Sequence, residues 1–383
     1  MNHEQELALI DRCISASAEG TTTHGPQGQS SRNRYLSEER YRREIASLFA
    51  GLPSPGLHGS QLAAPNNYRR AATPLGDLLC TRDETGAAHA FHNACQHRGS
   101  TLVTDDGGCR ARLTCPYHAW SYATDGRLVG VPAKEQCFAD LDTHKLGLRE
   151  IPTVEKYGFV WLCPEAGADG AEVALDHFLG DMGAALAWLS LEKLSIFRQT
   201  RNTWQGNWKI FAEGGLETYH FSVAHRDTIA PHFLRNTAIV DQLEAHFRVV
   251  MPNQRLGEMV KKPREQWTLK DCTHTLFSLM PGDSLLMQRD HVDWISMRPL
   301  AIDCTEITIT SLIPEDVGTL SPDHRAFWQR NLDITDQVLT EDWVIGEGIQ
   351  RSLSSGAIED IQYGSNEWAR AAFNHLIEQR LAS

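Results

Sequence analysis

Two short cysteine–histidine pairs constrain this chain more than any other feature of its sequence. Cys95-Gln96-His97 and Cys115-Pro116-Tyr117-His118 are separated by seventeen residues. Each pair follows a short strand-like run, FHNA for the first pair and ARLT for the second. The tips of two hairpins would therefore bring two thiolates and two imidazoles to one point. The surrounding segment is expected to be a small β domain whose loops converge.

Three interpretations fit two thiolates and two imidazoles in this pattern. A tetrahedral zinc site uses these ligand types, but its pairs usually join like ligands, as in C-x₂₋₄-C followed by H-x₃₋₅-H. A [2Fe–2S] cluster with both cysteines on one iron and both histidines on the other fits mixed pairs better. Four unrelated core residues are the plainest alternative. The remaining cysteines are scattered and typical of small buried apolar residues: Cys13, Cys80, Cys109, Cys137, Cys163, Cys272 and Cys304.

The segment around these pairs has the pattern of an antiparallel β domain. From Gly51 to about Pro164, short runs such as LLCTRD and YGFVWLCP alternate with the turn signals DETG, DDGG and ATDGR. Strand-like runs return over His274–Pro314. We expect an α+β fold in which the β domain precedes, or is inserted into, a second domain.

Helical patterns account for much of the remaining chain. Ser37 is a candidate N-cap for the first of them. The predicted helices cover Leu36–Ala50, Leu175–Leu191, Asp323–Gln350 and Asn366–Leu381. Residues 1–33 are polar, with many Ser, Thr and Gly residues around Thr21–Asn33, which predicts a mobile arm or an arm that wraps another chain.

Composition and charge exclude several classes of protein. The chain is 41% hydrophobic and 22% charged, which is normal for a globular protein. Its net charge of −13 argues against a nucleic-acid or membrane-surface binder. No apolar run reaches the ~18 residues of a membrane span, and the first thirty residues lack the pattern of a signal peptide. Nine cysteines without such a signal favour reduced thiols or metal ligands. We therefore expect a cytoplasmic protein.

A second group of metal-ligand residue types lies within Asn207–His225, which reads NWKIFAEGGLETYHFSVAH. On one helix, Glu213, Glu217 and His220 would share a face, and His225 would lie past the helix end. Two imidazoles and a carboxylate with open coordination positions form the facial triad of non-haem Fe(II) oxygenases. A histidine pair five residues apart is a weak signal by itself, and a structural role is commoner.

The first set of motifs resembles the Rieske domain of Rieske non-haem iron oxygenases. C-x-H-R-G at Cys95–Gly99 is followed after the seventeen-residue gap by C-P-Y-H-A-W at Cys115–Trp120 and by Asp125-Gly126. The match runs from about Phe49 to Pro164. Imidazoles in place of two thiolates remove negative charge, so such a cluster accepts an electron readily. The resemblance implies a [2Fe–2S] cluster with the ligands Cys95, His97, Cys115 and His118.

The second motif extends this resemblance into the rest of the chain. N-W-K-x₃-E-x₃-[ED]-x-Y-H-x₄-H is the family pattern that supplies two ligands of a mononuclear iron, which implies His220 and His225 here. Many members have Asn after the first Glu, where this chain has Gly214-Gly215. Glycines are costly within a helix, so they suggest a bulge or a close approach near the iron.

The third iron ligand of the family is a carboxylate on a C-terminal helix. The corresponding segment resembles Val338–Gln350, VLTEDWVIGEGIQ, and its ligand matches Asp342. Asp336 and Glu341 are the fallbacks, because other carboxylates lie on the same predicted helix and most such groups are simply solvated.

Glu217 is expected to act beside the iron rather than on it. In the family, the corresponding carboxylate joins an iron-bound histidine to a cluster-bound histidine of the neighbouring subunit. The implied relay runs from His118 of one chain through Glu217 to His220 of the next. A glutamate here, rather than an aspartate, resembles the subgroup that acts on quaternary amines such as carnitine, choline and glycine betaine. Glu213 lies nearer the helix start and is expected to be structural.

The resemblance implies an enzyme, the oxygenase alpha subunit of a multicomponent Rieske system. One [2Fe–2S] cluster and one mononuclear Fe(II) per chain would use O₂ to hydroxylate or demethylate a small organic substrate, with a quaternary amine as one candidate. The chain carries no GxGxxG signature, so electrons from NAD(P)H would arrive through a flavin/iron–sulfur reductase or a ferredoxin. The short chain resembles members that form head-to-tail homotrimers without a second subunit type.

The implied fold is a Rieske domain over 47–164 and a helix-grip (START-like) catalytic domain over 165–383. The arm and helix of 1–46 would belong to the catalytic domain. Candidate residues of the substrate pocket are Phe211, Phe277, Met287, Trp294 and Met297.

Other functions remain open at this point. An aromatic-ring hydroxylating dioxygenase or an aromatic-acid O-demethylase would have the same length and motifs. A Rieske electron carrier without oxygenase activity is disfavoured, because most of the chain follows the β domain and carries the second histidine pair in register. A structural zinc protein is the remaining alternative.

Overall fold

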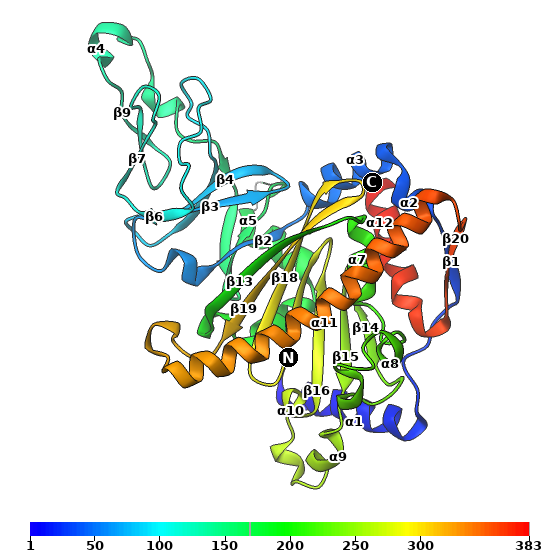
Figure 1. Cartoon of the computed structure of the whole chain (residues 1–383). Coiled ribbons are helices and arrows are strands. Elements are labelled where there is room, and N and C mark those ends of the chain that lie inside the picture. The colour runs from blue at the N-terminus through cyan, green and yellow to red at the C-terminus, as the bar shows by residue number, and fades with distance from the viewer. Residues whose placement is uncertain (168–169, 383) are drawn as a thin grey trace. The chain divides into compact units, whose positions relative to one another are not determined.

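The computed structural model describes residues 1–167 and 170–382 (Figure 1). Two compact units form: Met1–Leu48 with Leu179–Ser383, and Phe49–Phe178. Within the described residues, no helix is both long enough and apolar enough to cross a bilayer. The predicted α+β class is confirmed, with an antiparallel β unit and a second unit of antiparallel sheet and helices.

The unit Phe49–Phe178 consists of three small antiparallel sheets. Their strand orders are β10-β5-β4-β3-β6, β7-β8-β9 and β11-β12-β2. The strands are β2 (Ser54–His58), β3 (Asn67–Thr73), β4 (Gly76–Arg82), β5 (Ala88–His92), β6 (Gly107–Cys109), β7 (Arg112–Thr114), β8 (Ser121–Ala123), β9 (Leu128–Gly130), β10 (Glu150–Ile151), β11 (Thr153–Lys156) and β12 (Phe159–Leu162). The short helix α4 (Lys134–Cys137) and the helix α5 (Gly170–Leu179) complete the unit.

Turn chemistry accounts for the hairpins of this unit. In the predicted DETG turn between β4 and β5, the Asp83 carboxylate accepts the backbone N–H groups of Thr85 and Ala87 at 2.8 and 2.9 Å. Aspartate favours such turns because its side chain bonds to the backbone two residues on. Gly126, in the ATDGR turn, has φ +84°, and a Cβ there would lie 2.5 Å from the Phe91 ring. This position therefore requires glycine.

The second unit is organised around a seven-stranded antiparallel sheet of order β13-β19-β18-β17-β16-β15-β14. These strands are β13 (Ser195–Trp204), β14 (Ile239–Leu243), β15 (His246–Pro252), β16 (Thr273–Leu279), β17 (Asp283–Met287), β18 (Val292–Ala301) and β19 (Cys304–Ile313). A separate pair joins β1 (Gly28–Ser31) to β20 (Asp360–Tyr363). Figure 1 shows helix α11 (Pro322–Ser355) lying across the strands of the large sheet.

Helix α11 packs on the sheet together with α7 (Trp208–Gly214). Their contact is close because Gly346 of α11 lies against Phe211 of α7, where a Cβ would be 2.6 Å from the ring. An apolar cluster fills the space between these helices and strands β18 and β19, with Phe211, Ile295, Met297, Ile307, Ile309 and Trp343 as its buried members. The other helices of this unit are α1 (His3–Glu19), α2 (Asn33–Leu36), α3 (Glu38–Glu44), α6 (Met182–Leu189), α8 (Phe221–Ala224), α9 (Leu256–Met259), α10 (Leu269–Cys272) and α12 (Trp368–Ala382).

Of the two alternatives predicted for residues 1–33, the mobile arm was wrong, and an arm that wraps another chain stays a prediction. His3–Glu19 forms helix α1, which begins with a capping box of Asn2 and Gln5 and buries Leu9, Ile10 and Cys13. Residues 28–31 then pair with β20. The helix predicted over 36–50 does have Ser37 as an N-cap, but it is an α-helix only to Glu44 and continues as a π-helix from Ile45 to Phe49.

Candidate metal centres and the cavity beside them

Cys95 and Cys115 each begin a tight turn at the end of a strand. The N–H of Gly99 donates to the carbonyl of Cys95 at 2.9 Å, and the N–H of Ala119 donates to the carbonyl of Cys115 at 3.0 Å. Gly99 and Ala119 both have positive φ, +74° and +58°. The two turns have the same form, so each presents its cysteine and the histidine two or three residues later to one side.

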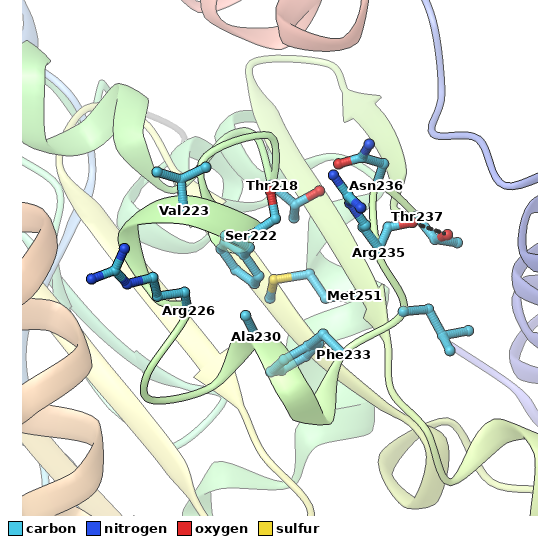
Figure 2. A pocket seen from close by; sticks show the side chains of 12 residues that line it. Thr218, Ser222, Val223, Arg226, Ala230, Phe233, Arg235, Asn236, Thr237 and Met251 are labelled. Carbon is cyan, nitrogen blue, oxygen red and sulfur yellow. Dashed lines mark hydrogen bonds between the residues drawn. The ribbon is translucent and has the colours of Figure 1, made fainter.

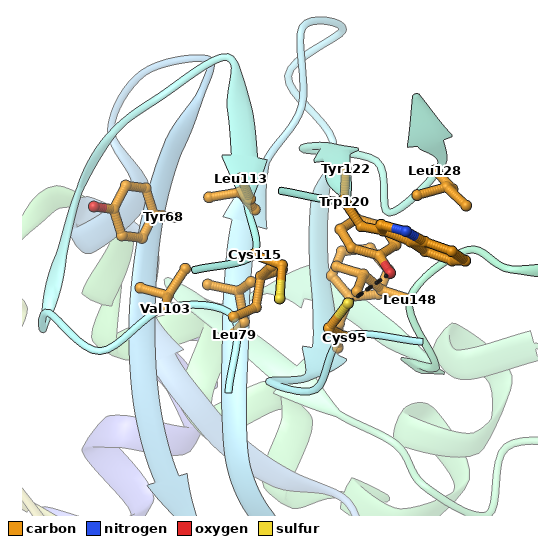
Figure 3. Packing of buried hydrophobic residues seen from close by; sticks show 12 residues of the cluster. Tyr68, Leu79, Cys95, Val103, Leu113, Cys115, Trp120, Tyr122, Leu128 and Leu148 are labelled. Carbon is orange, nitrogen blue, oxygen red and sulfur yellow. Dashed lines mark hydrogen bonds between the residues drawn. The ribbon is translucent and has the colours of Figure 1, made fainter. Parts of the chain in front are cut away.

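The four side chains of these turns converge. Cys95 and Cys115 are buried and their sulfurs face one another within the apolar cluster of this unit (Figure 3). The rings of His97 and His118 have centroids 4.6 Å apart. Nδ1 of His97 is buried and has no hydrogen-bond partner in the described part of the chain. Such an orphaned ring nitrogen, beside two thiols and a second imidazole, fits the donor set of a Rieske cluster.

Backbone N–H groups surround the sulfurs. Burial raises the pKa of Cys115, but the N–H groups of Tyr117 and His118 outweigh it, and the pKa is lowered overall. The pKa of Cys95 is raised, chiefly by burial. Because a thiolate is the form that binds a metal, these N–H groups favour the ligand form of Cys115.

Tyr122 is a residue that the sequence reasoning missed. Its hydroxyl oxygen accepts the N–H of Gln96 at 2.9 Å and lies 3.3 Å from Sγ of Cys95 (Figure 3). The hydroxyl hydrogen is therefore free to donate to the sulfur. Tyr122 lies two residues after the C-P-Y-H-A-W motif, and nothing in this spacing indicates that its hydroxyl would lie beside a cysteine sulfur. Trp120, inside that motif, stacks on His97 with centroids 4.6 Å apart.

The second set of residues does not lie on one continuous helix, so that prediction was wrong. Helix α7 ends at Gly214, and Glu217 and His220 lie in the turns before the short helix α8. Gly215 lies so close to β16 that a Cβ would be 2.8 Å from Leu276. The close approach that the two glycines suggested is thus found at Gly215, whereas a Cβ at Gly214 would meet no described atom within 4 Å.

His220 and His225 nonetheless meet at one point, together with Asp342 of α11. Their candidate ligand atoms all lie within 4.8 Å of one another. Nε2 of His220 is 3.4 Å, and Nε2 of His225 is 2.9 Å, from Oδ1 of Asp342. Both Nε2 atoms are buried, and neither has hydrogen-bond geometry to any partner within the described residues. Two free imidazole nitrogens and one carboxylate fit a two-histidine, one-carboxylate metal site.

The other ring nitrogen of each histidine is held by a glutamate. Nδ1 of His220 is 2.5 Å from Oε1 of Glu217, and Nδ1 of His225 is 2.7 Å from Oε2 of Glu341. Glu217 also accepts the N–H of Tyr219. Burial raises the pKa of Glu217, but its contact with His220 outweighs this and the pKa is lowered. These carboxylates fix which nitrogen of each ring faces Asp342.

The fallback carboxylates occupy other positions. Glu341 contacts the Nδ1 side of His225 rather than the point where the two Nε2 atoms meet. Oδ2 of Asp336 accepts a hydrogen bond from Arg198 at 2.8 Å. Glu213 is fully buried and accepts hydrogen bonds from Tyr35 at 2.8 Å and from Asn374 at 2.9 Å.

A cavity of about 370 Å³ adjoins His220, His225 and Asp342. Phe211 and Met297 line it, as the sequence suggested, whereas Phe277, Met287 and Trp294 are not among its lining residues. In the strands of the large sheet, Leu276, Leu286 and Ile295 face the cavity instead. Side chains of adjacent strand residues point to opposite faces, so the prediction chose the wrong face at these three positions.

A smaller cavity of about 340 Å³ lies beside α8 (Figure 2). Phe221, Phe233 and Met251 line both cavities and so form a shared apolar wall. The other residues that line the smaller cavity include the polar side chains of Thr218, Ser222, Arg226 and Arg235.

Family models match two stretches that together make up about three quarters of the chain. The model described as "Rieske [2Fe-2S] domain" matches residues 57–155, and the model described as "Ring hydroxylating alpha subunit (catalytic domain)" matches residues 191–383.

Curated relatives match over part of their length. The large subunit of anthranilate 1,2-dioxygenase from Acinetobacter baylyi is 30% identical over 66% of this chain and 54% of its own. The glycine betaine monooxygenase oxygenase subunit from Chromohalobacter salexigens is 32% identical over 44% of this chain and 37% of its own. The chain thus spans about half the length, or less, of these relatives.

Solved structures share the fold over almost the entire chain. A quaternary ammonium Rieske monooxygenase in complex with L-carnitine has a TM-score of 0.77 at 19% identity, covering 97% of this chain and 98% of that one. Naphthalene 1,2-dioxygenase from Rhodococcus sp. has a TM-score of 0.74 at 18% identity, covering 100% and 99%. The resemblance read from the motifs is confirmed, and this chain belongs to the ring-hydroxylating alpha subunit family, with a Rieske [2Fe–2S] domain ahead of the catalytic domain.

Proposed function

We propose that this chain is the oxygenase component of a multicomponent Rieske system. The observation that carries the proposal is the meeting of His220, His225 and Asp342 at the edge of a cavity, with both Nε2 atoms free of hydrogen bonds. Two imidazoles and one carboxylate leave coordination positions open for O₂ and substrate chemistry. A ferrous ion held by these three residues would supply the activation of O₂.

The electron would enter through the other group of ligands. Cys95, His97, Cys115 and His118 are assigned to the [2Fe–2S] cluster, because their side chains converge and N–H groups surround the sulfurs. A separate NAD(P)H-dependent reductase or ferredoxin would supply the electrons. This role needs a partner, since the chain itself carries no dinucleotide-binding motif.

The protein's own residues prepare the site in three ways. Glu217 and Glu341 hold the Nδ1 protons of the two histidines, so that each Nε2 points inward. The apolar side chains of the cavity exclude water and hold the body of the substrate. The bend after α7 brings Glu217 and His220 to the cavity rather than along a helix surface.

Glu217 is also proposed to link two subunits. It is 7% exposed and already binds His220 through one oxygen. In the relay inferred from the family motif, its carboxylate would also accept an N–H of His118 from a neighbouring chain. A head-to-tail trimer is the assembly proposed, because each chain would both give and receive an electron.

The substrate is proposed to be a small organic molecule that is hydroxylated or demethylated. Glutamate at position 217 and relatives such as the glycine betaine monooxygenase subunit support a quaternary amine. The anthranilate dioxygenase relative and the apolar cavity support an aromatic compound.

The test combines metal analysis with O₂ uptake. Anaerobically reconstituted protein is analysed for iron and sulfide and then supplied with a surrogate reductase and a substrate panel, with uncoupled peroxide subtracted. The expected result is a mononuclear iron in addition to the two cluster irons, and product formed with O₂ consumption. Cluster irons alone, with no product, would instead indicate a Rieske electron carrier.

A further inference from the structure

A second, more polar cavity of about 580 Å³ adjoins the cavity beside the histidines. The two cavities share the lining residues Ile229, Phe233, His274, Leu286, Val338 and Leu339. Beyond these shared residues, the second cavity is lined by polar side chains that include Asn253 and Arg255. A molecule that occupies both cavities would thus have an apolar end beside the histidines and a polar end beside Asn253.

Asn253 lines this polar end and has a buried hydrogen-bond donor without a partner. The residue follows β15 and is 4% exposed. Its Oδ1 accepts the backbone N–H of Arg255 at 3.0 Å. Because a backbone N–H can only donate, this bond fixes which end of the amide is the oxygen. Nδ2 is therefore left over, buried and without a partner within residues 1–167 and 170–382.

Arg255 brings a positive charge to the same place. Its Nε lies 3.4 Å from Oδ1 of Asn253, and among the described residues its side chain forms no ion pair. Burial and then the charge of Arg255 lower the pKa of His274 to about 4. His274, which lines both cavities, is therefore neutral at neutral pH and does not compete with Arg255 for an anion.

The other charged groups at this end already have partners. Nε of Arg289 is 3.4 Å from Asp271. His291 lies between Asp290 at 2.7 Å and Asp293 at 3.2 Å.

The carboxylates that line the two cavities are also occupied. Asp290 pairs with His291, Glu217 with His220 and Glu367 with Arg370, and Asp342 faces the proposed metal site. Among the Arg, Lys, Asp and Glu side chains that line the two cavities, Arg255 is therefore the one without an ion pair in the described part of the chain, and Asn253 beside it carries a donor without a partner.

We propose that Arg255 and Asn253 bind the carboxylate of the substrate, whose apolar body lies in the cavity beside His220 and His225. This inference rests on the proposed function, since it names the substrate class of the same site. A guanidinium and an amide N–H₂ are both donors, and together they suit a carboxylate through charge-assisted hydrogen bonds. A quaternary amine would meet this requirement only if it also carried a carboxylate.

Binding to the metal-loaded protein tests the proposal without turnover. The probes are the straight-chain acids from butanoate to decanoate and the ω-phenyl acids from phenylacetate to phenylpentanoate. Each acid is compared by calorimetry with its primary amide and with the trimethylammonium compound of matching length. We expect the best acid to bind at least about tenfold more tightly than its amide, as one charge-assisted bond implies.

Two variants and a matched control locate the effect. Arg255→Met keeps the length of the side chain and removes its charge, so it should weaken the acid at least about tenfold and leave the amide unchanged. Asn253→Asp keeps the shape of the side chain but replaces the N–H₂ donor by an oxygen that pairs with Arg255. It should likewise weaken binding of the acid and leave binding of the amide unchanged. Arg289→Met is the control, because Arg289 is already paired with Asp271.

Several outcomes would overturn the proposal. These are no binding by any acid of the panel, acids and amides that bind equally, trimethylammonium compounds that bind more tightly, or an Arg255→Met variant that weakens acid and amide alike. The oxygenase proposal fails separately. Protein that discriminates acids through Arg255 but holds no mononuclear iron would contradict only the oxygenase, whereas an active oxygenase without that discrimination would contradict only the carboxylate site.

Discussion

Nδ1 of His225 lies 2.7 Å from Oε2 of Glu341, while Nε2 of the same ring lies 2.9 Å from Oδ1 of Asp342. Two consecutive carboxylates of α11 therefore hold opposite sides of one imidazole. The first orients the ring and the second faces the point where His220 also arrives.

Asp342→Ala should lose the mononuclear iron and all product while keeping the Rieske visible spectrum, and so should His220→Ala and His225→Ala. Each variant removes one of the three proposed iron ligands, whereas the proposed cluster ligands lie elsewhere in the chain. Iron per chain and the visible spectrum are the measurements. Asp336→Asn is the control and should keep its iron, because Asp336 bonds to Arg198. Full iron in Asp342→Ala would move the ligand to Asp336 or Glu341.

Tyr122→Phe should lower the reduction potential of the cluster. Its hydroxyl lies 3.3 Å from Sγ of Cys95, and a hydrogen bond to sulfur stabilises the more negative, reduced form. Losing a hydrogen bond worth about 1 kcal/mol would lower the reduction potential by roughly 40 mV for a one-electron couple. Redox titration followed by visible spectroscopy measures the shift. Tyr68→Phe, in the same apolar cluster but bonded to Asp105, should leave the potential unchanged; equal shifts in both variants would refute the assignment.

Glu217→Gln should keep both metals yet slow electron transfer severely. A neutral amide has only one acceptor oxygen and cannot hold two imidazole N–H groups in the same way. Single-turnover reoxidation of the reduced cluster in the presence of substrate and O₂ measures the rate. Co-expression of Cys95→Ser with His220→Ala then tests transfer between subunits. Mixed rings should recover part of the activity, because some junctions join an intact cluster to an intact iron, and mixed rings without activity would place the transfer within one chain.

His291 should make the stability of its unit depend on pH. Burial lowers its pKa, but the contacts with Asp290 and Asp293 outweigh this and raise it to about 9, above the unfolded value of about 6.5. The folded state therefore holds the proton more tightly, so the stabilisation is complete below about pH 6.5 and is lost as the pH rises through 9. The free energy of unfolding should fall by up to about 3 kcal/mol over this interval.

Urea unfolding at a series of pH values measures this dependence. His291→Gln should flatten it, whereas His144→Gln, at an exposed position, should not. An unchanged slope in His291→Gln would show that the pH dependence arises from other groups.

The sequence allowed the ligand residues to be proposed because they recur at fixed spacings within local motifs. The two cysteine–histidine pairs each lie in one turn, and His220 and His225 lie on either end of the four-residue helix α8. The course of the backbone between helix α7 and His220 was not predictable in the same way. Helix α7 ends at Gly214, and Gly215 then lies against Leu276 of β16. A contact with a strand so much later in the chain leaves no periodic signal in the sequence.

The remaining misses have equally physical causes. Leu276 rather than Phe277 lines the cavity. The sequence did not show this, because a strand that is buried on both faces lacks the alternation of apolar and polar residues that would distinguish its two faces. Helix α1 was overlooked because its buried residues Leu9, Ile10 and Cys13 are few among polar neighbours. Tyr122 was overlooked because its hydrogen bond to the sulfur of Cys95 depends on where the strand that carries Tyr122 lies in space. The spacing of residues in the sequence does not show this.

The positions of Glu341 and Asp342 on α11 make this helix intolerant of a change in length. Successive helical residues differ by about 100° in direction, and the two carboxylates use that difference to reach two sides of His225. Deleting or inserting one residue between the packed Trp328 and Glu341 would rotate both groups away from the imidazole while leaving the composition of the helix almost unchanged. Substitutions on the exposed face of α11 should therefore leave the positions of Glu341 and Asp342 unchanged, whereas the insertion of a single residue would displace both.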